Sequence, residues 1–125
     1  MKIKVNVSLL EDFATAFNRH DCALLVSMIT EDCVFETSFG SQSYGERYVG
    51  REILALTFPK IWHSFPDARW ENLAHTVCGS RGFSEWTFRG TDINGKFIEV
   101  RGVDLFVFRD GKICRKDTFR KDRHN

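Results

Sequence analysis

The residue with the clearest chemical potential is Asp104, which interrupts an otherwise apolar strand pattern. Residues 98–108 alternate so that one face of a strand carries only apolar side chains, Gly102 and Asp104. A carboxyl group on such a face is unfavourable unless it is paired, hydrogen-bonded or protonated. Asp104 is therefore a candidate for acid–base chemistry. The alternative is a structural acid that hydrogen-bonds the backbone or pairs with Arg89 or Arg101.

Asp117 is the second candidate carboxyl group. The last strand is predicted to return across the Asp110-Gly111 turn, beside the strand that holds Asp104. Pairing across this turn predicts that Asp104 and Asp117 project to the same concave side. Two carboxyl groups in one apolar cavity ionise at different pH values, so together they would supply an acid and a base. The alternative for Asp117 is a surface ion pair with Arg115 or Lys116.

A set of mainly aromatic side chains is predicted to line an apolar pocket around these carboxyl groups. A site for a hydrophobic ligand is mostly apolar and contains a few polar groups. Each aromatic residue could equally serve as ordinary core, and the histidine could be a polar helix end. The predicted lining consists of Phe13, Phe17, Phe35, Thr37, Trp62, His63, Trp86, Phe88 and Phe106.

Helices are predicted in the first half of the chain. Ser8 and Glu11 match a capping box, with Ser8 as the N-cap of the first helix. Asp21 is predicted to cap a short second helix. A third helix is predicted from about residue 50 to 63, with Ile53, Leu54 and Ile61 inward and an interruption at Pro59.

Strands dominate the second half, after a first strand predicted at 33–39. Asn94-Gly95 and Asp110-Gly111 are strong hairpin signals. The later strands are predicted at 69–78, 83–91, 96–109 and 112–120. Three helices before a curved antiparallel sheet predict an α+β fold in which a cone encloses a pocket. One domain is expected over 1–125.

Composition excludes several functional classes. The 125 residues carry a net charge of +1 and no basic stripe, which argues against nucleic-acid binding. No apolar run approaches the length of a membrane span, and the first residues do not resemble a signal peptide. The four cysteines are scattered singly, which favours reduced thiols in a cytoplasmic protein over a zinc or redox site. No metal or organic cofactor is expected.

Four short segments carry a resemblance to a known family. They are residues 31–36, Gly50-Arg51-Glu52, Gly102-Val103-Asp104 and Asp110-Gly111-Lys112-Ile113. Together they resemble the SnoaL-like branch of the nuclear-transport-factor-like superfamily, which includes ketosteroid isomerase, polyketide cyclases and limonene epoxide hydrolase. The resemblance implies the cone-shaped fold. It does not fix the reaction, because one scaffold hosts many functions.

Matching positions to these relatives leaves only two of their catalytic groups. Against ketosteroid isomerase, the oxyanion-hole aspartate falls on Asp104, whereas the tyrosine and the general base fall on Phe13 and Thr37. Against limonene epoxide hydrolase, one aspartate falls on Asp117. Its other catalytic residues fall on Phe35, Thr37, Trp86 and Phe88. The resemblance therefore does not imply the usual chemistry of either enzyme.

Two functional hypotheses follow. The first is an enzyme that uses Asp104 and Asp117 for proton transfer on a small hydrophobic molecule, as an isomerase, cyclase, dehydratase or hydrolase. The second is a non-catalytic ligand-binding or dimerisation module on the same fold. A homodimer is predicted in either case, through the apolar residues Val103, Leu105 and Val107 on the outer side of the sheet.

Overall fold

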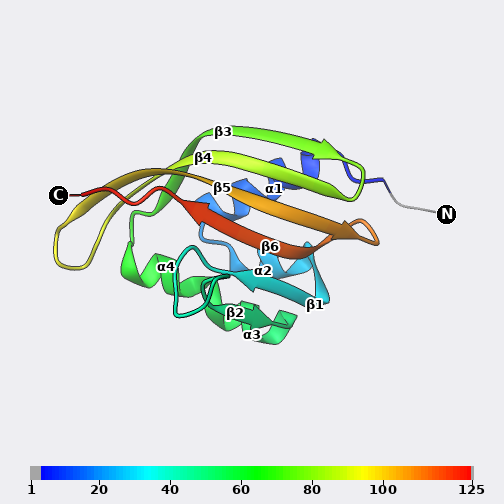
Figure 1. Cartoon of the computed structure of the whole chain (residues 1–125), viewed down its shortest axis with the longest axis horizontal. Helices are drawn as coiled ribbons and strands as arrows, with labels where there is room; N and C mark the ends of the chain where they lie inside the picture. Colours follow the sequence, from blue (N-terminus) through cyan, green and yellow to red (C-terminus); the bar gives the residue numbers. More distant parts are fainter. Residues whose placement is uncertain (1–3, 125) are drawn as a thin grey trace.

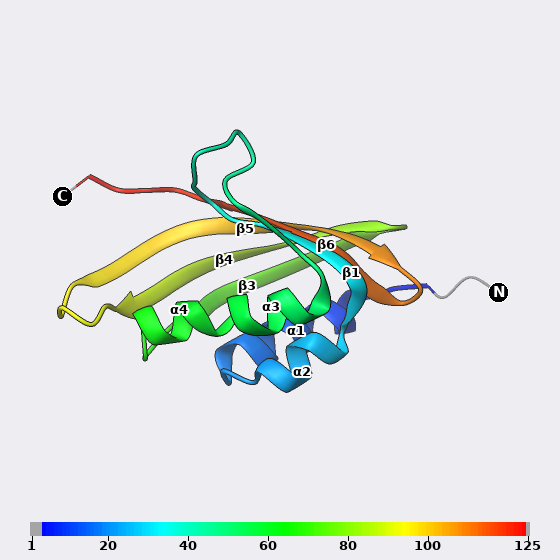
Figure 2. The ribbon, with the colours of Figure 1, turned by 90° about the horizontal axis from the view of Figure 1, so that it is seen from below.

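The computed structural model describes residues 4–124 and has the predicted α+β architecture. One curved, unclosed sheet of six strands has helices on one face only (Figures 1 and 2). We call the face toward the helices the inner face and the opposite one the outer face. Residues 1–3, on which part of the signal-peptide prediction rests, lie outside the described residues. The single domain over 1–125 stays a prediction.

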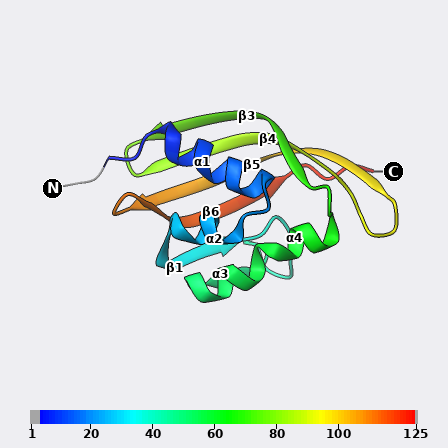
Figure 3. The same ribbon diagram turned by 180° about the vertical axis from the view of Figure 1, so that it is seen from behind.

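Helices α1 (Val7–Asn18) and α2 (Cys22–Ser27) lie across the inner face (Figure 3). The apolar residues of α1 recur at helical spacing, so Leu10, Phe13 and Phe17 are buried. The capping-box prediction is wrong, because the side chain of Asn6, not Ser8, accepts the hydrogen bond at the N-terminus of α1. Asp21 caps α2 as predicted, accepting from the backbone of Leu24 at 3.0 Å.

Pro59 divides the predicted third helix into α3 (Arg51–Thr57) and α4 (Pro59–Ser64). Proline lacks the N–H that would continue a helix, but it suits a first turn. Because of this division, α4 does not continue the helical spacing of α3, and a different set of its residues faces inward. Leu54 and Ile61 face inward as predicted, whereas Ile53 is 46% exposed.

The sheet contains β1 (Ile29–Glu36), β2 (Arg47–Val49), β3 (Arg69–Cys78), β4 (Arg81–Thr91), β5 (Phe97–Arg109) and β6 (Lys112–Arg120). Their order across the sheet is β2-β1-β6-β5-β4-β3. The sheet is mixed, not purely antiparallel as predicted, because β1 pairs with β6 in parallel. Four strands and the helices α3 and α4 separate β1 from β6 along the chain, and so long a connection permits parallel pairing.

The turn between β5 and β6 is the predicted one. Asp110 and Gly111 both have positive φ values, 55° and 75°, as in the tight hairpin turns that match the twist of a sheet. A bulge follows at once. Ile113 pairs with Phe108, but Arg115 pairs with Val107, so Cys114 is an extra residue in β6.

The core lies between the inner face and the helices and is rich in aromatic side chains. The ring of Phe13 contacts those of Phe17, Phe58 and Phe106 edge-on, with centroids 5.3, 6.3 and 5.8 Å apart. Within residues 4–124, none of the helices has the length and apolar character needed to cross a membrane.

Candidate functional site

A cavity of about 450 Å³ lies between the inner face and the helices. Its walls are mainly apolar, as a site for a hydrophobic ligand requires. The structure places seven of the nine predicted lining residues at this cavity: Phe13, Phe17, Phe35, Thr37, Trp86, Phe88 and Phe106. Thr37 is also tied locally, since its hydroxyl donates to the carbonyl of Phe39 and accepts from the backbone of Glu46, both at 2.9 Å.

Trp62 and His63 do not line the cavity, which corrects their placement in the predicted pocket wall. Because α4 restarts at Pro59, the residues that it turns toward the cavity are Lys60, Ile61 and Ser64. Trp62 is buried behind them and stacks on His20 with ring centroids 5.0 Å apart. His63 is exposed.

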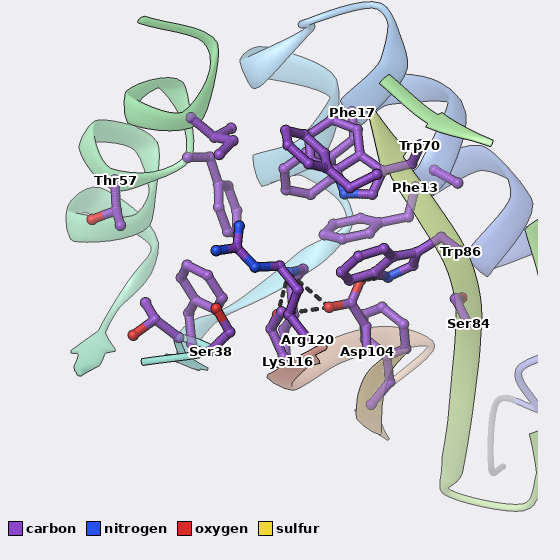
Figure 4. A pocket seen from close by; sticks show the side chains of 18 of the residues that line it. Phe13, Phe17, Ser38, Thr57, Trp70, Ser84, Trp86, Asp104, Lys116 and Arg120 are labelled. Atoms are coloured by element: carbon purple, nitrogen blue, oxygen red, sulfur yellow. Dashed lines mark hydrogen bonds and ion pairs between the residues drawn. The ribbon is translucent and has the colours of Figure 1, made fainter. Parts of the chain in front are cut away.

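Asp104 lies at the polar end of the cavity and is only 8% exposed (Figure 4). Its carboxylate accepts three hydrogen bonds. One oxygen accepts from the indole N–H of Trp86 at 3.0 Å. The other accepts from the Thr118 hydroxyl at 2.6 Å and the Lys116 ammonium at 3.1 Å. Three donors and an adjacent positive charge suit an ionised carboxylate, which is an acceptor only.

Lys116 is the cationic partner of Asp104 and is buried to a similar degree, at 6% exposure. Its ammonium nitrogen also lies 2.8 Å from the hydroxyl oxygen of Thr118. The same nitrogen is 4.5 Å from the ring centroid of Phe35 and 5.3 Å from that of Phe17. A cation over aromatic faces is attracted by the ring quadrupole, so the two rings partly replace lost water.

Asp117 does not share the cavity with Asp104, so the predicted pairing of the two carboxyl groups is wrong. The bulge in β6 shifts the register by one residue, and a one-residue shift moves every later side chain to the other face. Thr118 consequently pairs with Asp104, while Asp117 pairs with Leu105 on the outer face. Lys116 reaches the inner face for the same reason.

The outer face instead holds Asp117 within a group of charged residues. Glu36 is 1% exposed and is paired with Arg115 and, at 2.7 Å, with Arg47. Asp117 lies 3.7 Å from the same arginine, Arg115. Burial, and then the nearby Glu36 carboxylate, raise the pKa of Asp117, and Arg115 opposes them only in part. Asp117 therefore lies on the face of the sheet away from the cavity.

Gly102 determines how Trp86 reaches Asp104. The two residues are direct cross-strand partners on β5 and β4. A methyl group at position 102 would overlap the six-membered ring of Trp86 and the carbonyl of Phe119. The missing side chain therefore lets the indole lie flat across β5, which directs its N–H to Asp104.

A row of polar residues crosses the inner face through Asp104. His75, Ser84, Asp104 and Thr118 are successive partners on β3, β4, β5 and β6. A ring nitrogen of His75 lies 2.7 Å from the Ser84 hydroxyl. Burial lowers the pKa of His75, although the charge of Glu11 opposes this effect. Ser84 lines the cavity.

Sequence reasoning missed three polar residues of the site, Lys116, Thr118 and Arg120, which all lie on β6 and line the cavity. The run of basic residues near the C-terminus is typical of a solvent-exposed last strand, which is how the sequence pattern is interpreted. The bulge at Cys114 turns these side chains to the inner face, and no glycine or proline in the sequence marks the position of the bulge. Among residues 4–124, no three His, Cys, Asp or Glu side chains gather as a metal site.

We expect Gly102→Ala to lower the free energy of unfolding by about 1–3 kcal/mol, because the added methyl displaces the Trp86 ring. Trp86→Phe removes the ring atoms that would be overlapped. The double variant should therefore lose less stability than the sum of the two single variants in urea unfolding. Additive losses would show that Gly102 does not position Trp86.

Asp117→Asn should stabilise the fold at pH 7. A carboxyl group whose pKa is raised in the folded protein disfavours folding once it ionises, so its stability penalty grows as pH rises above its ordinary value of 3.8. Urea unfolding should show a gain for Asp117→Asn at pH 7 that vanishes when the pH falls and the wild-type group is protonated. Asp12→Asn on the exposed face of α1 is the control. A pH-independent loss of stability would contradict this account.

Comparisons with solved structures identify the fold. A candidate polyketide cyclase from Xanthomonas campestris pv. campestris has a TM-score of 0.80 at 23% identity, covering 90% of this chain and 87% of that one. An NTF2-like protein of unknown function from Mesorhizobium loti has a TM-score of 0.76 at 28% identity, covering 93% and 90%. TerC, co-crystallised with polyporic acid, has a TM-score of 0.78 at 16% identity, covering 92% and 90%.

No curated protein matches the sequence. A family model does match, and it spans most of the chain. The model describes the SnoaL-like domain and aligns with residues 10–116, which run from within α1 to within β6. The segments that carry the resemblance in the sequence fall inside this range. The chain therefore belongs to the SnoaL-like domain family.

Proposed function

We propose that this protein is a cofactor-independent enzyme that moves a proton within a ring-containing carbonyl compound. The observation that carries the proposal is the position of Asp104, a buried carboxylate beside a buried ammonium at the end of an apolar cavity. Charged groups in such surroundings are unfavourable unless paired, and they often mark functional sites. The candidate polyketide cyclase among the fold relatives, and the polyporic acid co-crystallised with TerC, support a small-molecule ligand here.

The proposed reaction begins with transfer of a proton from a carbon next to the substrate carbonyl to the carboxylate of Asp104. The electron pair left behind forms an enolate, whose oxygen carries the negative charge. The ammonium of Lys116 stabilises this charge. Return of the proton from Asp104 to a different carbon completes an isomerisation. Attack of the enolate carbon on a second carbonyl, with the proton delivered to the new alkoxide, completes a cyclisation.

A ligand-binding module is the alternative. It is favoured by the three hydrogen bonds to Asp104, which hold the carboxylate firmly and engage both of its oxygens. The open cavity leaves room for a ligand under either function, and the buried ion pair at its end favours the enzyme. Cytoplasmic location stays a prediction.

Hydrogen–deuterium exchange separates these two functions. Aromatic ketones and 1,3-dicarbonyl compounds are incubated with the protein in D₂O, and loss of the proton next to the carbonyl is followed by NMR. We expect catalysed exchange in the wild type and a loss of about 10²-fold or more in Asp104→Asn, as for removal of a general base. Asp117→Asn is the matched control and should keep full activity, because Asp117 faces outward.

Circular dichroism must accompany these assays, because breaking a buried ion pair can cost about 3–5 kcal/mol. Thr118→Val removes a hydrogen bond from Asp104 without a change of charge and should reduce exchange less than Asp104→Asn. Exchange that survives in folded Asp104→Asn would exclude Asp104 as the base. Tight binding without exchange would make the binding module the better account.

We also propose that the protein is a homodimer through its outer face. A shallow groove on this face is lined by Phe83, Val103, Leu105 and Phe119, and Phe119 is 51% exposed. Val107 lies on the same face of β5. The helices cover only the inner face (Figure 2). Apolar surface of this kind usually marks an interface.

Light scattering should give twice the chain mass at micromolar concentration. Leu105→Arg should give a monomer, because the substitution places a charge in the apolar interface. Leu56→Arg is the matched control: Leu56 is 72% exposed but lies on α3, on the helix side. A wild-type monomer, or an equal effect of both variants, would contradict the proposed interface.

A further inference from the structure

We infer that the ligand of the cavity is an aromatic anion whose charged end is bound by Arg120. The inference rests on the proposed function only in taking this cavity as the ligand site. It adds the charge of the ligand and the residue that recognises it. Its three supports are the balance of charge at the cavity, the position of Arg120 and the aromatic walls.

The charged side chains that line the cavity are mostly basic. They are Lys60, Lys116 and Arg120, against the single acid Asp104 among the described residues. Lys116 and Asp104 neutralise one another at 3.1 Å. Lys60 and Arg120 have no acidic partner among the lining residues and so place positive charge beside an apolar space. Walls of low dielectric constant strengthen the field of such charges, which favours a negatively charged ligand.

Arg120 is placed to recognise such a charge. It pairs with Gly102 in the β5–β6 register, and Figure 4 shows its side chain reaching over the cavity beside Lys116. Its side chain is 25% exposed. Its partner is Asp122, which is 69% exposed and accepts two hydrogen bonds, at 3.2 and 3.0 Å, through one oxygen. An ion pair with so exposed a carboxylate is weak, so a ligand anion can replace it.

The guanidinium group makes this recognition specific. It presents five N–H donors in a planar fork, and Asp122 occupies only two of them. A carboxylate binds such a fork through two parallel hydrogen bonds. The rest of the ligand is defined by the walls, where the indoles of Trp70 and Trp86 and several phenyl rings face the space. Planar aromatic rings suit these surfaces.

These features predict an aromatic carboxylic acid, or an enol or phenol acidic enough to be ionised at neutral pH. The rings would lie in the aromatic part of the cavity, with the anionic group against Arg120. A neutral ligand of equal shape gains the apolar contacts but leaves the guanidinium without a ligand partner. The charge of the ligand, independent of its turnover, is thus the property to test.

The test compares two probes of nearly equal shape, the anion 2-naphthoate and its neutral analogue 2-naphthamide. Binding is followed by the fluorescence of the tryptophans, since Trp70 and Trp86 line the cavity. We expect the wild type to bind naphthoate at least about tenfold more tightly than naphthamide. This ratio of affinities should fall as the salt concentration rises. Arg120→Gln should bring the two affinities within about twofold, and Arg120→Lys should restore part of the preference.

Lys121→Gln is the matched control, because Lys121 is the next residue and borders the outer groove instead of the cavity. It removes the same charge and should leave the preference for naphthoate intact. Asp122→Asn should tighten naphthoate binding by releasing Arg120. Equal or tighter binding of naphthamide by the wild type would overturn the inference. So would an unchanged preference in Arg120→Gln, or no binding of naphthoate at millimolar concentration. Absence of proton exchange with retained naphthoate preference would instead count only against the proposed enzyme.

Discussion

The buried ion pair between Asp104 and Lys116 is the interaction on which the rest of the site depends. Two charges removed from water are tolerated only when hydrogen bonds satisfy their remaining donors and acceptors. Trp86 and Thr118 supply those bonds to the carboxylate, and the Phe35 ring lies beneath the ammonium. These groups come from β1, β4, β5 and β6, so the pair also fixes how four strands meet at the cavity.

The bulge at Cys114 makes that pair possible. Without the extra residue, β6 would turn Arg115 and Asp117 toward the cavity and leave Lys116 on the outer face, so Asp104 would face a second acid instead of its cationic partner. With it, Lys116 and Arg120 line the cavity, while Asp117 joins Glu36 and its arginines outside. One extra residue in a strand therefore decides which side chains border the cavity and which lie on the outer face.

The sequence allows most of the fold and part of the candidate site to be predicted. Period-two alternation identifies Asp104 as an acid on an apolar face, and the Asp110-Gly111 turn predicts the hairpin that the structure has. Alternation cannot reveal a bulge that no glycine or proline marks. The sequence therefore predicts Asp117 beside Asp104, where the structure has Thr118. The predicted placement of Trp62 and His63 in the cavity lining is wrong for a related reason. The helix restarts at Pro59, and this changes which residues face inward.

The indole N–H signals of the three tryptophans in a ¹H–¹⁵N NMR spectrum test the central claim most directly. Trp86 donates to Asp104, whereas Trp62 has no hydrogen-bond partner for its indole nitrogen among the described residues and lies outside the cavity. The account predicts that Asp104→Asn, and separately a bound cavity ligand, move the Trp86 signal and leave that of Trp62 in place. A Trp86 signal unaffected by Asp104→Asn would show that the buried network does not form, and would contradict the account.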